Sequence, residues 1–314
     1  MYKSTSIFDG WIYEHEQYRI VFETLVEEIE RALHGATPFV FPLLGDSRAG
    51  KSALLKDIEA HFGSRVSPSG HQQIISVAMP TVASNEALAV RIIKCILGDI
   101  TVKGKTYQIL DQARQTMQAA GLRVLLIDET NHLVERRSSE KAQTKDNRQT
   151  ADWFKELGDE SKISVVVSGL SHVCRMYTDN DQLENRGLVG ARIYPYAWSV
   201  QKDREQFQNT VLAGITHLQE NGWRLEVPPD VLIRLSYLGG GGYIGKARDF
   251  LVRVEEVGNR LKRIDSKLLS RAYKDKYRLD SHGDSVEFKA IDDLMLNRAH
   301  QTALARASSN GRGQ

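Results

Sequence analysis

Apolar residues fall into two patterns along the first two thirds of the chain. Short apolar runs at 39–44, 73–78, 124–127 and 163–167 have the length and composition of buried strands. Around them, residues 14–33, 52–62, 85–97, 107–120 and 150–157 carry apolar positions three or four apart, which is typical of helices that bury one face. Strands alternating with helices predict an α/β domain with a parallel sheet covered on both faces.

The strand pattern fades after about residue 198. Residues 204–218, 229–238, 243–261 and 266–277 have helical spacing, which predicts a separate small helical domain. The small, polar end at 305–314 is expected to be disordered. We therefore predict an N-terminal helical segment at 1–36, an α/β core at 37–199, a helical lid at 200–280 and a partly disordered tail at 281–314.

Composition places the chain among soluble proteins. Of 314 residues, 41% are hydrophobic and 26% charged, and no apolar run approaches the roughly 20 residues of a membrane span. The first residues lack a secretory pattern, and Cys95 and Cys174 lack metal-type spacing, so we expect a cytoplasmic protein with reduced thiols. The net charge is only +2, so any contact with nucleic acid must come from a local basic patch.

A phosphate-binding motif lies between the first predicted strand and the next helix. It follows the pattern G-x-x-x-x-G-K-[ST] and consists of Gly45, Asp46, Ser47, Arg48, Ala49, Gly50, Lys51 and Ser52. Backbone N–H groups and the helix N-terminus suit the phosphates of ATP. Lys51 is expected to reach the β- and γ-phosphates, and Ser52 to ligate Mg²⁺.

Two carboxylates follow the apolar strand at 124–127. Asp128 and Glu129 are expected at the carboxyl edge of the sheet, where ligands of parallel sheets bind. Asp128 is predicted to hold Mg²⁺, usually through water, and Glu129 to activate the attacking water. Together with the phosphate-binding loop, this pair predicts ATP hydrolysis.

Further polar residues are candidates for the same site. Ser168 ends the strand at 163–167 and could present its hydroxyl near the γ-phosphate, or simply terminate the strand. Arg186 is the first candidate for an arginine supplied to a neighbouring subunit's nucleotide, and Arg192 the second. The glycine run at 239–245 matches a dinucleotide fingerprint formally, but it follows a helix, so we interpret it as a helix-to-helix turn that places Arg248 within reach of the nucleotide.

These motifs resemble the TnsC/TniB branch of the AAA+ ATPases that regulate DNA transposition. The resemblance covers about 14–258 and includes the segments 127–133, 154–160, 163–169 and 182–186. At Thr130, Asn131 and His132 the chain departs from the family pattern, because the histidine is shifted. The resemblance implies an AAA+ P-loop domain with an α-helical lid, and ATP with Mg²⁺ as the ligands.

The resemblance also implies partners. It predicts a homo-oligomeric ring or filament, such as a hexamer or heptamer, on duplex DNA without sequence preference. It further predicts contacts with a transposase and with a target selector of the TniQ/TnsD kind, and no contact with a membrane. For DNA we expect Thr101, Lys103 and Lys105, and then the basic segment with Arg136 and Arg137, since lysines on a loop neutralise phosphates without reading bases.

Two other functions stay open from the sequence. A helicase loader or replication-initiator-like AAA+ protein would use the same ATPase for another task. A STAND-type scaffold would bind ATP as a switch with little turnover, although the long effector or repeat domain typical of that class is not visible in the sequence. We place the protein in the bacterial cytoplasm.

Overall fold

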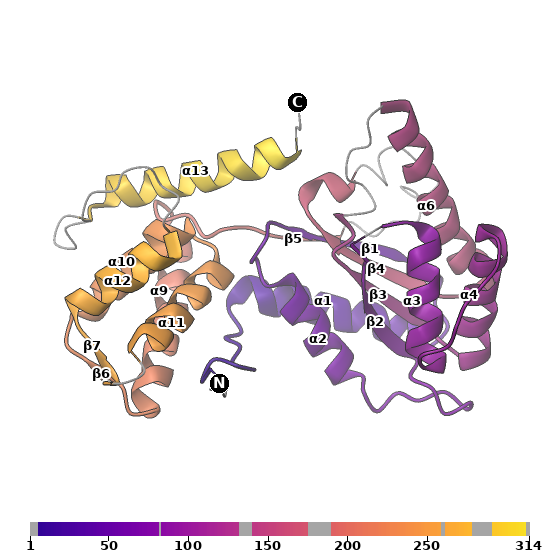
Figure 1. The fold of residues 1–314 in the computed structure, drawn as a ribbon, viewed down its shortest axis with the longest axis horizontal. Helices are drawn as coiled ribbons and strands as arrows, with labels where there is room; N and C mark the ends of the chain where they lie inside the picture. Colours follow the sequence, from indigo (N-terminus) through magenta and orange to yellow (C-terminus); the bar gives the residue numbers. More distant parts are fainter. Residues whose placement is uncertain are drawn as a thin grey trace. The chain divides into compact units, whose positions relative to one another are not determined.

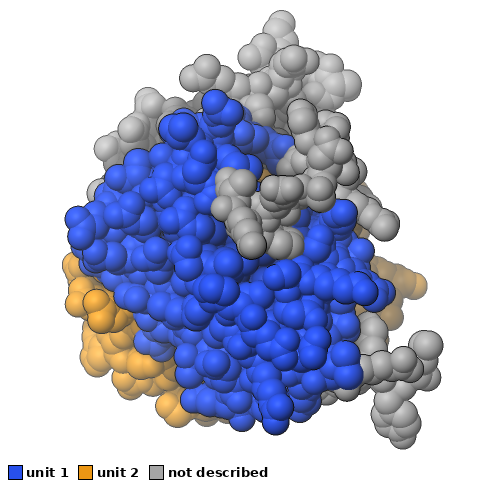
Figure 2. All heavy atoms as spheres, turned by 90° about the vertical axis from the view of Figure 1, so that its left-hand side faces the viewer, with its two compact units in different colours: residues 1–16, 48–50, 194–314 blue, residues 17–47, 51–193 orange. Residues whose placement is uncertain are grey.

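The computed structural model describes residues 6–81, 83–131, 140–174, 190–258, 261–277 and 291–311. They form two compact units. A sheet unit contains residues 17–47 and 51–193, and a helical unit contains residues 1–16, 48–50 and 194–314 (Figure 2). Each unit is described by itself.

The sheet unit is built on five parallel strands. They are β1 (Val40–Gly45), β2 (Ile74–Ala78), β3 (Val124–Asp128), β4 (Ser164–Gly169) and β5 (Ala191–Ile193). Their order across the sheet is β2-β3-β4-β1-β5. The first four strands are the apolar runs predicted from the sequence, since strands covered on both faces need apolar residues at nearly every position. The sequence did not predict β5, which has only three residues.

Helices cover both faces of this sheet (Figure 1). On one face, α3 (Asn85–Leu97), α4 (Thr106–Ala120) and α6 (Glu140–Ser161) share a core with alternate strand residues such as Leu125 and Val165. The opposite face meets α2 (Lys51–His61). The helix α1 (Glu16–Leu33) is joined to α2 by a hydrogen bond from Tyr18 to Asp57. The layered α/β fold predicted from the sequence is confirmed.

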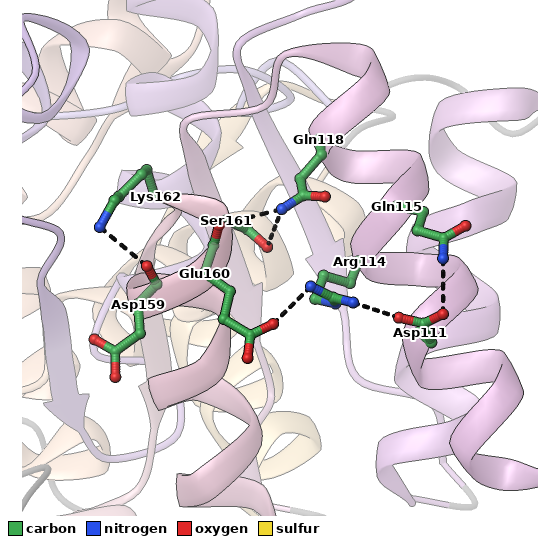
Figure 3. A network of polar contacts seen from close by, with 8 residues as sticks. All are labelled: Asp111, Arg114, Gln115, Gln118, Asp159, Glu160, Ser161 and Lys162. Carbon is green, nitrogen blue, oxygen red and sulfur yellow. Dashed lines mark hydrogen bonds and ion pairs between the residues drawn. The ribbon is translucent and has the colours of Figure 1, made fainter.

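A polar network ties the C-terminal ends of α4 and α6 together (Figure 3). Arg114 bonds the carboxylates of Asp111 and Glu160, each at 2.6 Å. Gln118 donates to the Ser161 hydroxyl at 3.1 Å. These helices lead into β3 and β4, so the network lies at the sheet edge opposite the strands' carboxyl ends.

The helical unit consists of α9 (Gln201–Glu220), α10 (Pro229–Gly240), α11 (Ile244–Gly258), α12 (Ser266–Tyr277) and α13 (Asp293–Gly311). It also holds a parallel pair of short strands, β6 (Arg224–Leu225) and β7 (Arg263–Ile264). The sequence missed this pair, because two residues are too few to show an alternation. The glycine run is the predicted helix-to-helix turn, and Gly242 is required there: its φ is +94° and a Cβ would lie 2.2 Å from the Tyr196 carbonyl oxygen.

The predicted disorder of residues 305–314 is wrong as far as residue 311, where α13 ends. Small side chains let this helix lie close to the turn after α10, since a Cβ on Gly241 would lie 2.5 Å from Ala303 Cβ. Leu296 is fully buried and His300 nearly so. These buried or closely packed residues, 296–303, hold the first half of α13 against the helical unit.

Residues 6–16 pack against the helices of the helical unit. Phe8 is fully buried in that unit's core. The Ile7 N–H donates to Glu255 at 3.0 Å, and His217 Nε2 lies 2.8 Å from the Ile7 carbonyl oxygen. We call residues 6–16 the N-terminal strap. In the described part of the chain, every helix is too short or too polar to span a bilayer.

Candidate functional site

The phosphate-binding loop runs from the end of β1 into α2. Gly45 is the last residue of β1 and Lys51 the first of α2, as the motif requires. Two loop residues have left-handed backbones, Arg48 at φ 67° and Gly50 at φ 99°. Ser47, Arg48 and Ser52 are exposed. A sharp turn that opens on a helix N-terminus presents backbone N–H groups to an anion.

Lys51 is half-buried at the base of this loop. Its ammonium donates to the carbonyl oxygens of Gly45 at 2.7 Å and Asp46 at 2.9 Å. Burial lowers the pKa of Lys51, while the nearby charges of Asp128 and Asp46 raise it. A half-buried ammonium near the carboxylates of the loop and of β3 suits the binding of phosphates together with a metal ion.

Asp128 and the loop lie at the same edge of the sheet. β4 pairs with β3 on one side and with β1 on the other, with Val167 opposite Ile127 and Ser168 opposite Leu43. Two strand spacings separate β1 from β3, which is about 10 Å. The space between the loop after β1 and Asp128 after β3 is therefore wide enough for the terminal phosphates of a nucleotide and a metal ion.

The oxygen ligands here fit Mg²⁺. The Ser52 hydroxyl is exposed on the first turn of α2, and Asp128 is half-buried at the end of β3. Among the described residues, no group of three or more His, Cys, Asp or Glu could hold a metal ion. A hard cation with few protein ligands completes its shell with water and phosphate oxygens, as Mg²⁺ usually does.

Glu129 follows Asp128 in a strained turn. Its φ is 57°, which non-glycine residues rarely adopt, and its side chain is exposed. Its own N–H donates to Asp128 Oδ1 at 2.9 Å. Strained residues of this kind cluster at functional sites.

Ser168 is fully buried at the end of β4. Its hydroxyl donates to Asp128 Oδ1 at 2.8 Å. The structure therefore places Ser168 beside the carboxylate of Asp128, in the same edge of the sheet as the loop. The sequence identified the residue but not this partner.

The structure also brings in two residues that sequence reasoning did not assign to the site. Thr130 is fully buried, and its hydroxyl donates to the Ser168 carbonyl at 2.6 Å. Asn131 Oδ1 accepts a hydrogen bond from the Leu170 N–H at 2.5 Å. The only sequence signal was a polar pair directly after the two carboxylates, where the family pattern shifts.

Thr101, Lys103 and Lys105 lie together on the segment between α3 and α4. All three are exposed, while Ile100 and Val102 between them pack against the core of the sheet unit. This alternation directs the two lysines to solvent. Arg136 and Arg137, the other predicted DNA contacts, lie outside the described residues.

The candidate arginines are spread over the chain. Arg186 lies outside the described residues, and Arg192 is exposed on β5, opposite Leu44 of β1. Arg248 belongs to the helical unit, where it donates to the Phe8 carbonyl of the N-terminal strap. The structure thus gives Arg248 a partner that the sequence did not suggest.

Comparisons with known proteins agree with this fold. The family model for the bacterial TniB protein matches residues 8–188. None of the curated proteins has a sequence that matches this chain.

Solved structures with the same fold include three archaeal proteins. The Aeropyrum pernix ORC1 protein, solved in complex with DNA, is 18% identical with a TM-score of 0.61, over 83% of this chain and 65% of that one. The Aeropyrum pernix ORC2 protein, in ADPNP-ADP complexes, is 15% identical with a TM-score of 0.61, over 92% and 75%. CDC6P from Pyrobaculum aerophilum is 14% identical with a TM-score of 0.61, over 86% and 70%. These likenesses confirm the AAA+ fold class predicted from the sequence.

Proposed function

Because the chain belongs to the family of bacterial TniB proteins, we propose that it is a Mg²⁺-dependent ATPase that assembles on duplex DNA and links target selection to a transposase. The observation that supports the ATPase is that the phosphate-binding loop after β1 and Asp128 at the end of β3 lie at the same edge of one sheet. There burial lowers the pKa of Lys51, and the charge of Asp128 opposes this shift by raising it. In P-loop NTPases, a lysine of the loop binds the phosphates, and a carboxylate at the end of a neighbouring strand binds the metal ion.

ATP binds through the loop in this proposal. Backbone N–H groups from Gly45 to Ser52 surround the phosphates, and Lys51 adds its charge to the β- and γ-phosphates. Ser52 and Asp128 would hold Mg²⁺, which would supply positive charge beside the phosphate oxygens. When ATP binds, the Lys51 ammonium gives up its hydrogen bonds to the Gly45 and Asp46 carbonyls and donates to phosphate oxygens instead.

Hydrolysis depends on Glu129 and on an arginine. The exposed Glu129 carboxylate orients the attacking water and accepts its proton. Arg186 from a neighbouring subunit stabilises the charge of the transition state, with Arg192 as the alternative. Arg248 contacts the nucleotide from the helical lid, for which it leaves its partner in the N-terminal strap.

DNA binding is proposed for the exposed segment that carries Thr101, Lys103 and Lys105. Its alternating burial directs both lysines outward, so they neutralise phosphates without contacting bases. The similar ORC1 structure was solved in complex with DNA, which supports a nucleic-acid partner for this fold. With a net charge of +2, affinity comes from repeating this patch around an ATP-bound ring or filament.

The proposed partners follow from the family. A ring or filament on target DNA presents one face to a TniQ/TnsD-type selector and recruits and activates the transposase. Arg136 and Arg137 are proposed as further DNA contacts.

The test combines turnover with microscopy. The purified protein should hydrolyse ATP only with Mg²⁺, and negative-stain images should show assemblies on duplex DNA only with ATP or a non-hydrolysable analogue. Binding of ATP without turnover or DNA assembly would indicate a nucleotide-switch scaffold. ATP-dependent binding to a replicative helicase, without binding to a transposase, would indicate a loader.

A further inference from the structure

The ends of β3 and β4 are joined beyond their last paired residues. The strand ladder ends with Ile127 opposite Val167. Thr130 then places two donors on one acceptor, because its hydroxyl and its N–H lie 2.6 Å and 3.0 Å from the Ser168 carbonyl oxygen. The side chain is fully buried, so water cannot replace the hydroxyl's bond.

Asn131 adds a second connection one residue further. Its Oδ1 accepts from the Leu170 N–H at 2.5 Å. Gly169 lies between the Ser168 carbonyl, which accepts, and the Leu170 N–H, which donates. It is approached so closely that a Cβ there would lie 2.9 Å from Thr130 Oγ1 and 2.8 Å from Asn131 Oδ1. We call Thr130 and Asn131, with their bonds to Ser168 and Leu170, the strand latch.

The strained Glu129 lies between two fixed neighbours. On one side, Asp128 accepts the Ser168 hydroxyl at 2.8 Å and the Glu129 N–H at 2.9 Å on the same oxygen. On the other side, Thr130 is held by the latch. A left-handed backbone at a glutamate persists only where its surroundings fix it, and these bonds fix it from both sides.

We propose that Thr130 is a positioning residue for ATP hydrolysis, which holds the backbone turn that presents the Glu129 carboxylate to the attacking water. Ser168 belongs to the same arrangement and orients Asp128, since its hydroxyl is donated to that carboxylate. The inference rests on the proposed ATPase. It assigns Thr130 no contact with nucleotide.

The test compares two substitutions of one side chain. Thr130→Val keeps the shape and removes the hydroxyl donor, whereas Thr130→Ser keeps the donor. The valine variant should lose at least about tenfold in kcat with KM for ATP within about twofold, the pattern of an interaction that acts in the transition state. The serine variant should stay within about threefold of wild-type kcat. Binding of a fluorescent ATP analogue with Mg²⁺ should be unchanged in both.

A double-mutant cycle with Glu129→Gln separates positioning from general loosening. If Thr130 acts through Glu129, adding Thr130→Val to Glu129→Gln should lower kcat by less than about twofold further, because coupled residues are not additive. Equal loss in both backgrounds would overturn the proposal. So would a valine variant with wild-type kcat, or one that loses ATP affinity and kcat together.

A second pair covers the case in which Thr130→Val does not fold. Asn131→Ala removes the acceptor for Leu170, and Asn131→Asp retains it. Asn131→Ala should show the selective loss of kcat, and Asn131→Asp should largely restore it; equal turnover in both would overturn the latch. A wild-type protein that does not hydrolyse ATP would instead remove the proposed function, and this inference with it.

Discussion

Lys51 holds its ammonium on two carbonyl oxygens of its own loop. Lys51→Ala should weaken ATP binding at least about tenfold, since a charge-assisted hydrogen bond contributes about 1.5–3 kcal/mol and 1.4 kcal/mol is a factor of ten. Titration with a fluorescent ATP analogue measures this. Lys56→Ala, an exposed lysine on the same helix, is the matched control and should bind normally. Unchanged affinity in Lys51→Ala would remove the loop from the proposal.

Glu129 is exposed, so the amide of Glu129→Gln fits without repacking. The variant should bind ATP normally and hydrolyse it about 10²–10⁴-fold more slowly, the usual contribution of a general base. Steady-state phosphate release checks this against Glu27→Gln, an exposed glutamate on α1 that should keep full activity. Wild-type turnover in Glu129→Gln would mean that another group activates the water.

The sequence could identify the chemical residues because their motif has fixed spacing within single loops. It could not predict the partner of Ser168, because that bond depends on the register between β3 and β4, 40 residues apart in the chain. The burial of Thr130 was equally hidden, since a threonine after two carboxylates also suits an exposed turn. The motif therefore identifies which residues belong to the site, but the contacts between them depend on how the strands pair in the sheet.

At the scale of elements, the four longer strands of the sheet and most of the helices were predictable, whereas the short strands β5, β6 and β7 and the helix α13 were not. Four of the five strands are continuous apolar runs with a clear signal. The N-terminal strap gave no signal, because Phe8 and Trp11 pack against a core formed by residues that are distant in the chain. The helix α13 was not predicted, because it contains small residues, such as Ala303, that pack closely against Gly241.

His15, in the N-terminal strap, should make the stability of the helical unit depend on pH. Its Nδ1 lies 2.8 Å from the Tyr196 hydroxyl, and burial lowers the pKa of His15 from 6.5 to about 4. The unfolded chain therefore takes up the proton first. Stability is full above pH 6.5 and falls as pH drops towards 4, by roughly 3 kcal/mol at most, because each pKa unit contributes 1.36 kcal/mol.

The measurement is thermal unfolding between pH 4 and pH 7. His15→Gln does not titrate, so its melting temperature should fall less over this range than that of the wild type. His34→Gln, with an exposed ring on α1, should behave like the wild type. Parallel curves for His15→Gln and wild type would contradict the assignment.

Asp293 anchors the start of α13. Its carboxylate accepts from the Trp198 indole at 3.0 Å and from Arg234 at 2.9 Å, and these two donors hold the pKa of Asp293 below its usual range. Asp293→Ala should speed amide hydrogen exchange in the first turns of α13 while exchange in β1 and β3 stays constant. Gln301→Ala, an exposed position on the same helix, is the control. Equal exchange in both variants would show that buried Leu296 suffices to hold the helix.

At the scale of the whole molecule, the affinity for DNA should fall as the salt concentration rises. We expect only a few lysines of each protomer to determine how steeply it falls. Each phosphate contact that releases a counterion contributes about −0.9 to the slope of log affinity against log salt. Replacing Lys103 and Lys105 by alanine should flatten this slope and weaken binding equally for all sequences. Fluorescence anisotropy with ATP at several salt concentrations measures both effects.

The control removes the same charge from another surface. Lys267 and Lys274 are exposed on α12, so their double alanine variant has the same net charge as the test variant. It should keep the wild-type slope. If the two double variants lose affinity equally, net charge rather than the segment between α3 and α4 governs binding.

The N-terminal strap also sets the order in which the chain can fold during synthesis. The sheet unit ends at residue 193, so its strands can pair before the helical unit has left the ribosome. Phe8 is made long before α9 and α11, the helices that bury it. The N-terminal strap can therefore take its place only after these helices are made, and its contacts with them close a long loop, which costs conformational entropy.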